Sequence, residues 1–197
     1  MNLNVQRFLR LTEQAHTLVC WDIEATGLRG DYNSILCVSF KPYGKKPYTL
    51  SVDRPGKDGK LVKLVKAELE KYDCWVGYYS KGFDIKMVNT RLLQHRIDPV
   101  TPKPHIDMYY VLKYHLNTSR RSQGHLLTWL QEEATPDEAG AVGEIAEKMS
   151  VSAEVWNMIL QDPQKHMPKM RRRCESDAAG LEALYRRTSH LIKDIKF

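Results

Sequence analysis

Two carboxylates stand two residues apart at the end of the apolar run LVCWDIEATGL, Leu18 to Leu28. The residues from Thr17 to Trp21 favour strands, so Asp22 and Glu24 lie at the carboxyl end of a predicted strand. Because side chains alternate along a strand, both acids point to one face while Ile23 points to the other. Like charges this close repel unless a cation lies between them. The pattern fits a metal site, and its commoner alternative is a solvated turn.

Two further acids are candidates for the same place. Asp84, in GYYSKGFDIKMVNTRL, follows a buried strand and begins a predicted helix, where an acid favoured by the helix dipole is the simpler explanation. Asp177, in RRRCESDAAGLEALYRR, borders the inward stripe formed by apolar residues at 174, 178, 181, 184 and 185. A carboxylate at the edge of an apolar stripe costs free energy unless it has a partner. If both helices flank the first strand, the four acids meet.

The elements that would position these acids follow a recognisable order. Three strand-like runs, at 16–23, 34–40 and 48–52, have short connections and predict an antiparallel meander. A helical pattern at 61–72, a short buried strand at 74–78 and a second helical pattern at 83–94 follow. This order places the fourth strand parallel to the first through a helical crossover. We expect an α/β fold with a mixed sheet, three antiparallel strands plus parallel strands, flanked by helices.

The second half of the chain is predicted to be helical. The expected helices are MYYVLKYHL capped by Asp107, HLLTWLQEE after Gly124, EAGAVGEIAEKM after Pro136, AEVWNMIL capped by Ser152, and a long last helix from about Pro168 to Ile192. The linkers between them are short, so the helices should pack on the sheet. We therefore expect one domain over residues 1–197.

Composition excludes several classes of protein. Of the 197 residues, 42% are hydrophobic and 27% charged, which is typical of a globular chain. No apolar run approaches the roughly 20 residues of a membrane helix, and the N-terminus lacks the apolar centre of a signal peptide, so we expect a cytoplasmic protein. The four cysteines are far apart, which predicts neither disulfides nor a zinc ribbon. The net charge of +6 favours a polyanionic partner but also suits simple solubility.

The three acidic motifs, DIEATGL, GYYSKGFDIKMVNTRL and CESDAAGLEAL, resemble in this order the exonuclease motifs of the DnaQ-like, or DEDD, 3′-to-5′ exonuclease superfamily, which has an RNase H-like fold. The segment HIDMYYVLKYHL and the final motif are most similar to the proofreading domains of family-B DNA polymerases and their stand-alone bacterial and phage relatives. The resemblance extends from about Leu18 to Leu191.

This resemblance implies that Asp22, Glu24, Asp84 and Asp177 bind two Mg²⁺ or Mn²⁺ ions. Such ions, about 3.5 to 4 Å apart, position a water for in-line attack and neutralise the departing 3′-oxygen. By the same resemblance Asp22 bridges the ions, Glu24 and Asp177 hold the ion that activates water, and Asp84 acts through water ligands.

Substrate contacts are also implied by the resemblance. Thr26, Gly27 and Leu28, after the first motif, are expected at the terminal nucleotide, where Phe83 would stack on a base or only anchor its helix. Core packing is the favoured role for Phe83. Core packing is also favoured for the helix that follows Asp107, because Met108, Val111, Leu112 and His115 repeat at helical spacing.

Two positions depart from the family pattern. The family has a Tyr four residues, or a His five residues, before the last Asp, and here those positions are Arg173 and Arg172. Arginine stays protonated and cannot act as a base, although Arg173 could hold a phosphate or face solvent. His166 stands eleven residues before Asp177, about 16 Å along a helix, and could act only if Pro168 breaks that helix.

The middle motif has Tyr79 where the family often has Asn. Tyr79 is a candidate for orienting water, and packing at a strand end is the favoured alternative. His105 and Asp107 stand two residues apart, but no second pair at zinc-like spacing accompanies them, which argues against a zinc site.

Two main hypotheses follow. The first is a metal-dependent exonuclease that releases nucleoside monophosphates from the 3′ end of single-stranded DNA, with RNA possible. The second is a catalytically weakened RNase H-like module that binds nucleic acid or a replication or repair protein. An endonuclease or transposase-like member fits less well. None of these hypotheses involves a membrane.

Overall fold

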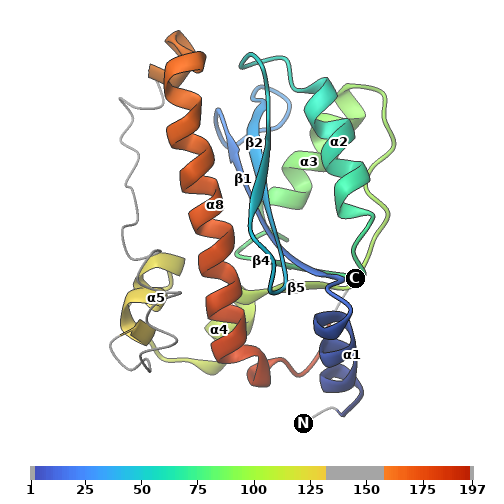
Figure 1. The fold of residues 1–197 in the computed structure, drawn as a ribbon, viewed down its shortest axis with the longest axis vertical. Coiled ribbons are helices and arrows are strands. Elements are labelled where there is room, and N and C mark those ends of the chain that lie inside the picture. The colour runs from blue at the N-terminus through green and yellow to red at the C-terminus, as the bar shows by residue number, and fades with distance from the viewer. Residues whose placement is uncertain (1–2, 132–157, 196–197) are drawn as a thin grey trace.

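The computed structural model describes residues 3–131 and 158–195 (Figure 1). The helices expected after Pro136 and after Ser152 fall wholly or mainly outside these ranges. A five-stranded sheet in the order β3-β2-β1-β4-β5 lies at the centre of the described residues. None of the described helices is long and apolar enough to cross a membrane.

The sheet is mixed, as the sequence predicts. β1 (Leu18–Ala25) pairs antiparallel with β2 (Ile35–Pro42), and β2 pairs antiparallel with β3 (Tyr48–Ser51). On its other side β1 pairs parallel with β4 (Cys74–Gly77), which pairs parallel with β5 (His105–Asp107). The α/β fold class with three antiparallel strands plus parallel strands is therefore confirmed.

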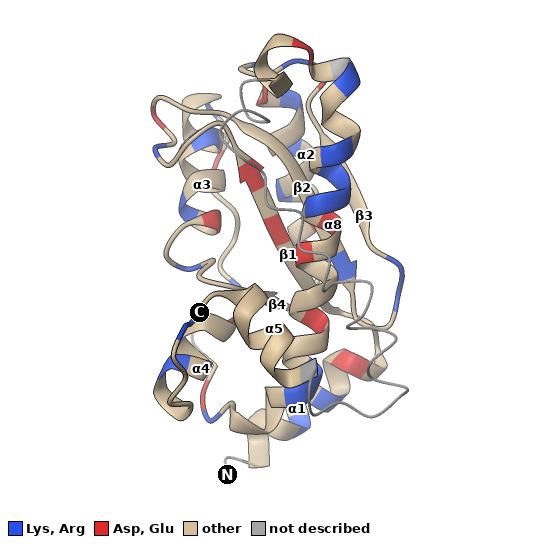
Figure 2. Ribbon diagram, turned by 90° about the vertical axis from the view of Figure 1, so that its left-hand side faces the viewer, with Lys and Arg blue, Asp and Glu red and all other residues tan. Residues whose placement is uncertain are grey.

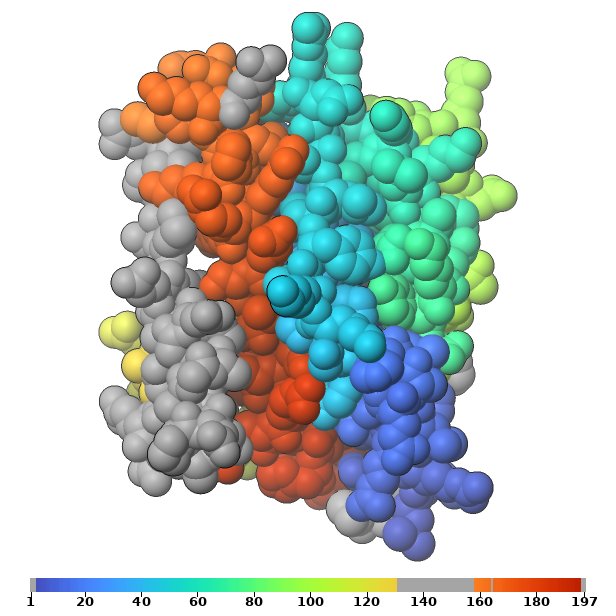
Figure 3. Space-filling model, viewed as in Figure 1, coloured from blue at the N-terminus to red at the C-terminus, as the bar shows by residue number. Residues whose placement is uncertain are grey.

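Helices cover both faces of the sheet (Figure 1). α2 (Gly59–Leu69) and α3 (Asp84–Gln94) lie on one face, and α8 (Pro163–Thr188) runs along β1 and β2 on the other. Figure 3 shows α8, orange to red, packed directly against the cyan β2–β3 part of the sheet. The other described helices are α1 (Leu3–Gln14), α4 (Met108–His115), α5 (Gln123–Gln131) and the short 3-10 turn η1 (Ser189–Leu191).

The alternation of side chains along β1 divides the core into two parts. Val19, Trp21 and Ile23 belong to a buried cluster that includes residues of α2 and α3. Leu18 and Cys20 belong to a second cluster, which includes residues of α4, α5 and the end of α8. Continuing the same alternation places Asp22 and Glu24 on the face of Leu18 and Cys20.

Some elements differ from the sequence prediction. α1 was not predicted, and β5 falls where only helix was expected, because three residues are too few for an alternating pattern. The last helix begins at Pro163, earlier than predicted, with Asp162 as its N-cap and Pro168 inside it. Pro168 lies in the second turn, where the loss of one backbone hydrogen bond near the helix start is tolerated.

Candidate metal centre

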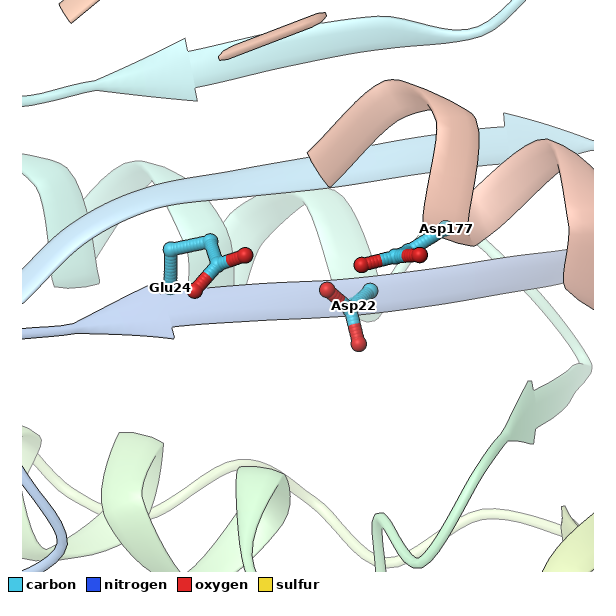
Figure 4. Close-up of side chains that lie close together, drawn as sticks. All are labelled: Asp22, Glu24 and Asp177. Atoms are coloured by element: carbon cyan, nitrogen blue, oxygen red, sulfur yellow. The ribbon is translucent and has the colours of Figure 1, made fainter. Parts of the chain in front are cut away.

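Three of the four predicted acids come together between β1 and α8. Asp22 and Glu24 lie on the same side of β1, and Asp177 reaches them from α8 (Figure 4). One carboxylate oxygen from each residue lies within 4.8 Å of the others. Figure 2 shows the acidic segments of β1 beside α8. We refer to Asp22, Glu24 and Asp177 as the acid cluster.

Asp84, the fourth predicted acid, lies close to the acid cluster but is not one of its members. It is the first residue of α3 and is 5% exposed. Its Oδ1 accepts a hydrogen bond from the backbone N–H of Ile23 at 3.3 Å, which anchors α3 to β1 between the two acids of that strand. Burial, together with the charges of Asp107 and Glu24, raises the pKa of Asp84 to about 7, against the opposing effect of backbone N–H groups.

The acids also perturb one another. Burial raises the pKa of Asp22 well above its usual value, and the nearby charges of Asp84, Asp177 and Glu24 add to the effect. A hydrogen bond from Cys174, whose Sγ lies 3.7 Å from Oδ2 of Asp22, acts in the opposite direction. The site therefore accumulates negative charge at a free-energy cost that a cation would relieve.

The acid cluster offers the kind of oxygen ligands that a hard divalent cation prefers. Carboxylate oxygens suit Mg²⁺ and Mn²⁺, and ligands on opposite sides of Mg²⁺ are about 4 Å apart at its usual bond length of about 2.1 Å. The 4.8 Å limit on the oxygens of the acid cluster is only slightly wider, so a small inward movement would complete three bonds to one ion. The residues present thus fit a metal ion.

Arg173 also lies in the acid cluster. Its Nε forms ion pairs with Oε1 of Glu24 at 2.8 Å and with Oδ2 of Asp177, one helical turn away, at 3.7 Å. The side chain is 23% exposed. The sequence offered a phosphate contact or a solvated position for this residue, and the structure shows that the guanidinium contacts the acids themselves. A phosphate contact by Arg173 stays a prediction.

Tyr79 occupies a constrained turn between β4 and α3. Its φ of 59° is in the left-handed region, which is unfavourable for an aromatic residue. Asp107 stabilises this turn, because its two oxygens accept hydrogen bonds from the backbone N–H groups of Tyr79 at 2.8 Å and Lys81 at 2.9 Å. Asp107 also caps α4, as predicted, by accepting from the N–H of Tyr109 at 3.1 Å.

The ring of Tyr79 is 47% exposed and packs edge-on against Tyr109, with 5.2 Å between the ring centroids. The predicted core stripe of α4 is only partly correct. Met108 and Leu112 are buried and Val111 is partly buried, whereas His115 is exposed. A role for Tyr79 in orienting water stays a prediction.

The segment after Glu24 forms a closed loop. The N–H of Thr26 donates to the carbonyl of Ser34 at 2.9 Å, and the N–H of Ser34 donates to Oγ1 of Thr26 at 3.0 Å. At Gly27 a Cβ would lie 2.6 Å from the side chain of Asn33, so this close approach favours glycine. Leu28 is 80% exposed at the tip, which leaves an apolar side chain available to a ligand.

The structure also shows the positions of two other predicted residues, Phe83 and His166. Phe83 is partly buried and packs against the core beside α3, in agreement with the favoured role. His166 lies within α8, which continues through Pro168. The break that would bring His166 to the acids is therefore absent, and the helical rise keeps it about 16 Å from Asp177 along the axis.

A buried hydrogen-bond network around Asp58, which the sequence did not reveal, also stabilises the loop that follows Glu24. Asp58, which has no exposed surface, accepts hydrogen bonds from Nε and Nη2 of Arg91, each at 2.8 Å, and from the N–H of Ile35 at 2.9 Å. His95 Nε2 lies 2.8 Å from Oδ1 of Asp58. Arg91 also donates to the carbonyl of Gly30 at 3.0 Å, which ties α3 to the loop. No local motif indicates contacts between residues so far apart in the chain.

Comparisons with known proteins agree with this architecture. A family model described as the RNase_H superfamily matches residues 19–142, which include Asp22, Glu24 and Asp84. Among solved structures, the family B DNA polymerase of the hyperthermophilic archaeon Pyrobaculum calidifontis is similar, with a TM-score of 0.62 and 15% identity. The match covers 86% of this chain and 24% of the polymerase, so the chain spans about a quarter of that protein. A search of curated proteins finds no match.

Proposed function

The chain belongs to the RNase_H superfamily, and we propose that it is a metal-dependent 3′-to-5′ exonuclease that releases nucleoside monophosphates from single-stranded DNA or RNA. The acid cluster carries this proposal. Three carboxylates from two elements converge within 4.8 Å, beside a fourth buried carboxylate at the start of α3. Such a concentration of acids weakens folding and repels an anionic strand unless cations are bound.

Each acid has a role in this proposal. Asp22, Glu24 and Asp177 hold the metal, and Asp84 lies where it can orient a water ligand while it anchors α3 to β1. A divalent ion here would lower the pKa of a bound water and stabilise the charge on the departing oxygen. Arg173 cannot take the proton from the attacking water, so the chain supplies no ordinary side-chain base at that position. We expect a slower enzyme than one with a tyrosine or histidine there.

The surroundings of the acid cluster suit a single strand. The loop from Thr26 to Ser34, which directly follows β1, exposes the apolar side chain of Leu28 at its tip. Tyr79 is half exposed in the turn before α3, and unpaired bases stack on such rings with little regard to sequence. These features favour an unpaired 3′ end over a duplex.

The decisive experiment follows a 5′-labelled single strand incubated with the protein and Mn²⁺ or Mg²⁺. A 3′-to-5′ exonuclease produces a ladder of shortened labelled products, needs the metal, and leaves a circular single strand intact. The same assay on a DNA strand and on an RNA strand of the same sequence shows which nucleic acid is degraded faster. Cleavage of the circle would indicate an endonuclease instead.

The variant for this assay is Asp22→Asn/Glu24→Gln, which removes two charges and keeps the shapes. Its control is Asp53→Asn/Asp98→Asn, which makes the same charge change at exposed positions. We expect the first variant to lose at least about a hundredfold in rate and the control to keep it. Equal rates in both variants, or full activity in EDTA, would contradict the proposal.

A second candidate is a binding module without appreciable nuclease activity. Arg173 favours it, because a guanidinium paired with Glu24 and Asp177 neutralises part of the charge that a metal would otherwise neutralise. Binding of a single-stranded oligonucleotide in EDTA, without degradation when Mn²⁺ is added, would support this candidate.

A further inference from the structure

The guanidinium of Arg173 is the feature of the acid cluster that the proposed function leaves unexplained. Arg171, Arg172 and Arg173 are consecutive, and the first two are exposed, as expected for a solvated run. Arg173 is turned inward because it precedes the fully buried Cys174 and lies one helical turn before Asp177. Of the three arginines, it alone meets acids of both β1 and α8.

The charges of the acid cluster indicate what this contact does. The cluster carries three negative charges when fully ionised. One divalent ion together with one guanidinium supplies three positive charges, whereas two divalent ions and the guanidinium would supply five, more than the acid cluster and the neighbouring Asp84 carry together. Because each carboxylate has two oxygens, Glu24 and Asp177 can pair with Arg173 and still bind one ion.

We infer that Arg173 takes the place of one of the two cations, so that the site binds one divalent ion per chain. This inference rests on the proposed function, since it concerns the same metal site. The guanidinium lies on the Glu24–Asp177 side, 2.8 Å and 3.7 Å from their oxygens, which is close enough to repel a second ion there. Arg173 is thus a positioning residue that sets the number of metal ions.

The experiment counts bound ions without any nuclease assay. The full chain is stripped of metal with a chelator and titrated calorimetrically with Mn²⁺ in the absence of nucleic acid. Arg173→Met keeps the volume of the side chain and removes its charge, and Arg172→Met makes the same change at the exposed neighbour. The wild type and Arg172→Met should bind one ion per chain, and Arg173→Met should bind two, because the charge that repels the second ion is gone.

Two outcomes would overturn the inference: two ions in the wild type, or a single ion in Arg173→Met as in Arg172→Met. Arg173→Lys is a second variant that keeps the charge if the methionine variant does not fold. It should bind one ion like the wild type, and a lysine variant that binds two would also overturn the inference.

Failure of the proposed function has a different signature. In that case the wild type and Asp22→Asn/Glu24→Gln would both give no Mn²⁺ heat, because the acid cluster would not be a metal site. If the wild type binds two ions and Asp22→Asn/Glu24→Gln binds none, the acid cluster is a metal site. That result would contradict only the role of Arg173.

Discussion

Asp58 and Asp84 are two buried aspartates in similar local settings with opposite electrostatics. Asp58 is the residue before α2, Asp84 is the first residue of α3, and each accepts a backbone N–H from a neighbouring strand residue, Ile35 or Ile23. Burial raises the pKa of Asp58, but hydrogen bonds from Arg91, His95 and the backbone outweigh it, so the pKa is lowered overall. For Asp84 burial dominates, and the pKa rises to about 7.

The difference separates a carboxylate that a cation of the chain neutralises from one whose ionised form burial disfavours. Asp58 is neutralised by Arg91, a cation of the chain itself, whereas burial and the charges of Asp107 and Glu24 disfavour the ionised form of Asp84. A buried carboxylate without a compensating cation costs stability, and natural chains keep such groups mainly at functional sites. The contrast can be tested by removing each acid in turn.

The largest expected effect is that of Asp58→Ala. This change leaves Arg91 buried with two unsatisfied donors, so we expect the free energy of unfolding to fall by about 3–5 kcal/mol. Urea unfolding at pH 7 with EDTA present measures it. Asp84→Ala is the matched variant, and a comparable loss of stability in that protein would remove the contrast between the two sites.

The second effect is the pH dependence of stability in EDTA. Because the pKa of Asp84 is about 7 when folded and near its ordinary 3.8 when unfolded, the folded state binds more protons between these values. Asp84 therefore makes stability fall, on the order of 2–4 kcal/mol, as pH rises from about 4 to about 7. Unfolding curves of wild type and Asp84→Asn over this range give the contribution of Asp84, and parallel curves would contradict it.

Asp58 should act with the opposite sign at lower pH. Its pKa is lowered on folding, so its stabilising contribution is complete above about pH 4 and is lost as pH falls through the folded value. In Asp58→Asn the free energy of unfolding should depend less on pH below about pH 4. Its dependence on pH between 4 and 7 should stay as in the wild type. A weaker pH dependence of stability between pH 4 and 7 in that variant would show that the two aspartates are coupled.

A smaller effect is expected for His95→Ala. His95 supplies one hydrogen bond to Asp58 and its side chain is 30% exposed, so Arg91 and Ile35 still hold the carboxylate without it. We expect a loss of about 1 kcal/mol in urea unfolding at pH 7. A loss as large as that of Asp58→Ala would mean that His95, not Arg91, is the main partner of Asp58.

The smallest effect is expected for Tyr79→Phe in the nuclease assay. The phenyl ring keeps the contact with Tyr109 and the backbone bond to Asp107, so the rate should stay within about twofold of wild type. His166→Ala, one helix turn from the start of α8, should behave in the same way. A hundredfold loss in the Tyr79 variant would instead assign its hydroxyl a part in orienting water.

The sequence by itself determined the sheet order up to β4 and the common face of Asp22 and Glu24, because strand alternation is a local property. It also indicated that Asp84 begins a helix beside β1, because that helix follows the strand parallel to β1. Asp107 was identified as a cap for the same local reason, and the hydrogen bond to Tyr109 confirms it.

Only the tertiary structure decided the partners of the buried charges. Asp58 and Arg91 are 33 residues apart, and nothing in the residues around either one indicates the pairing. The inward position of Arg173 likewise depends on the rotation of α8 against β1, which packing of the whole helix sets. Strand and helix patterns are local and can be read from neighbouring residues, whereas the neutralisation of a buried charge depends on which distant side chain folding brings within 3 Å.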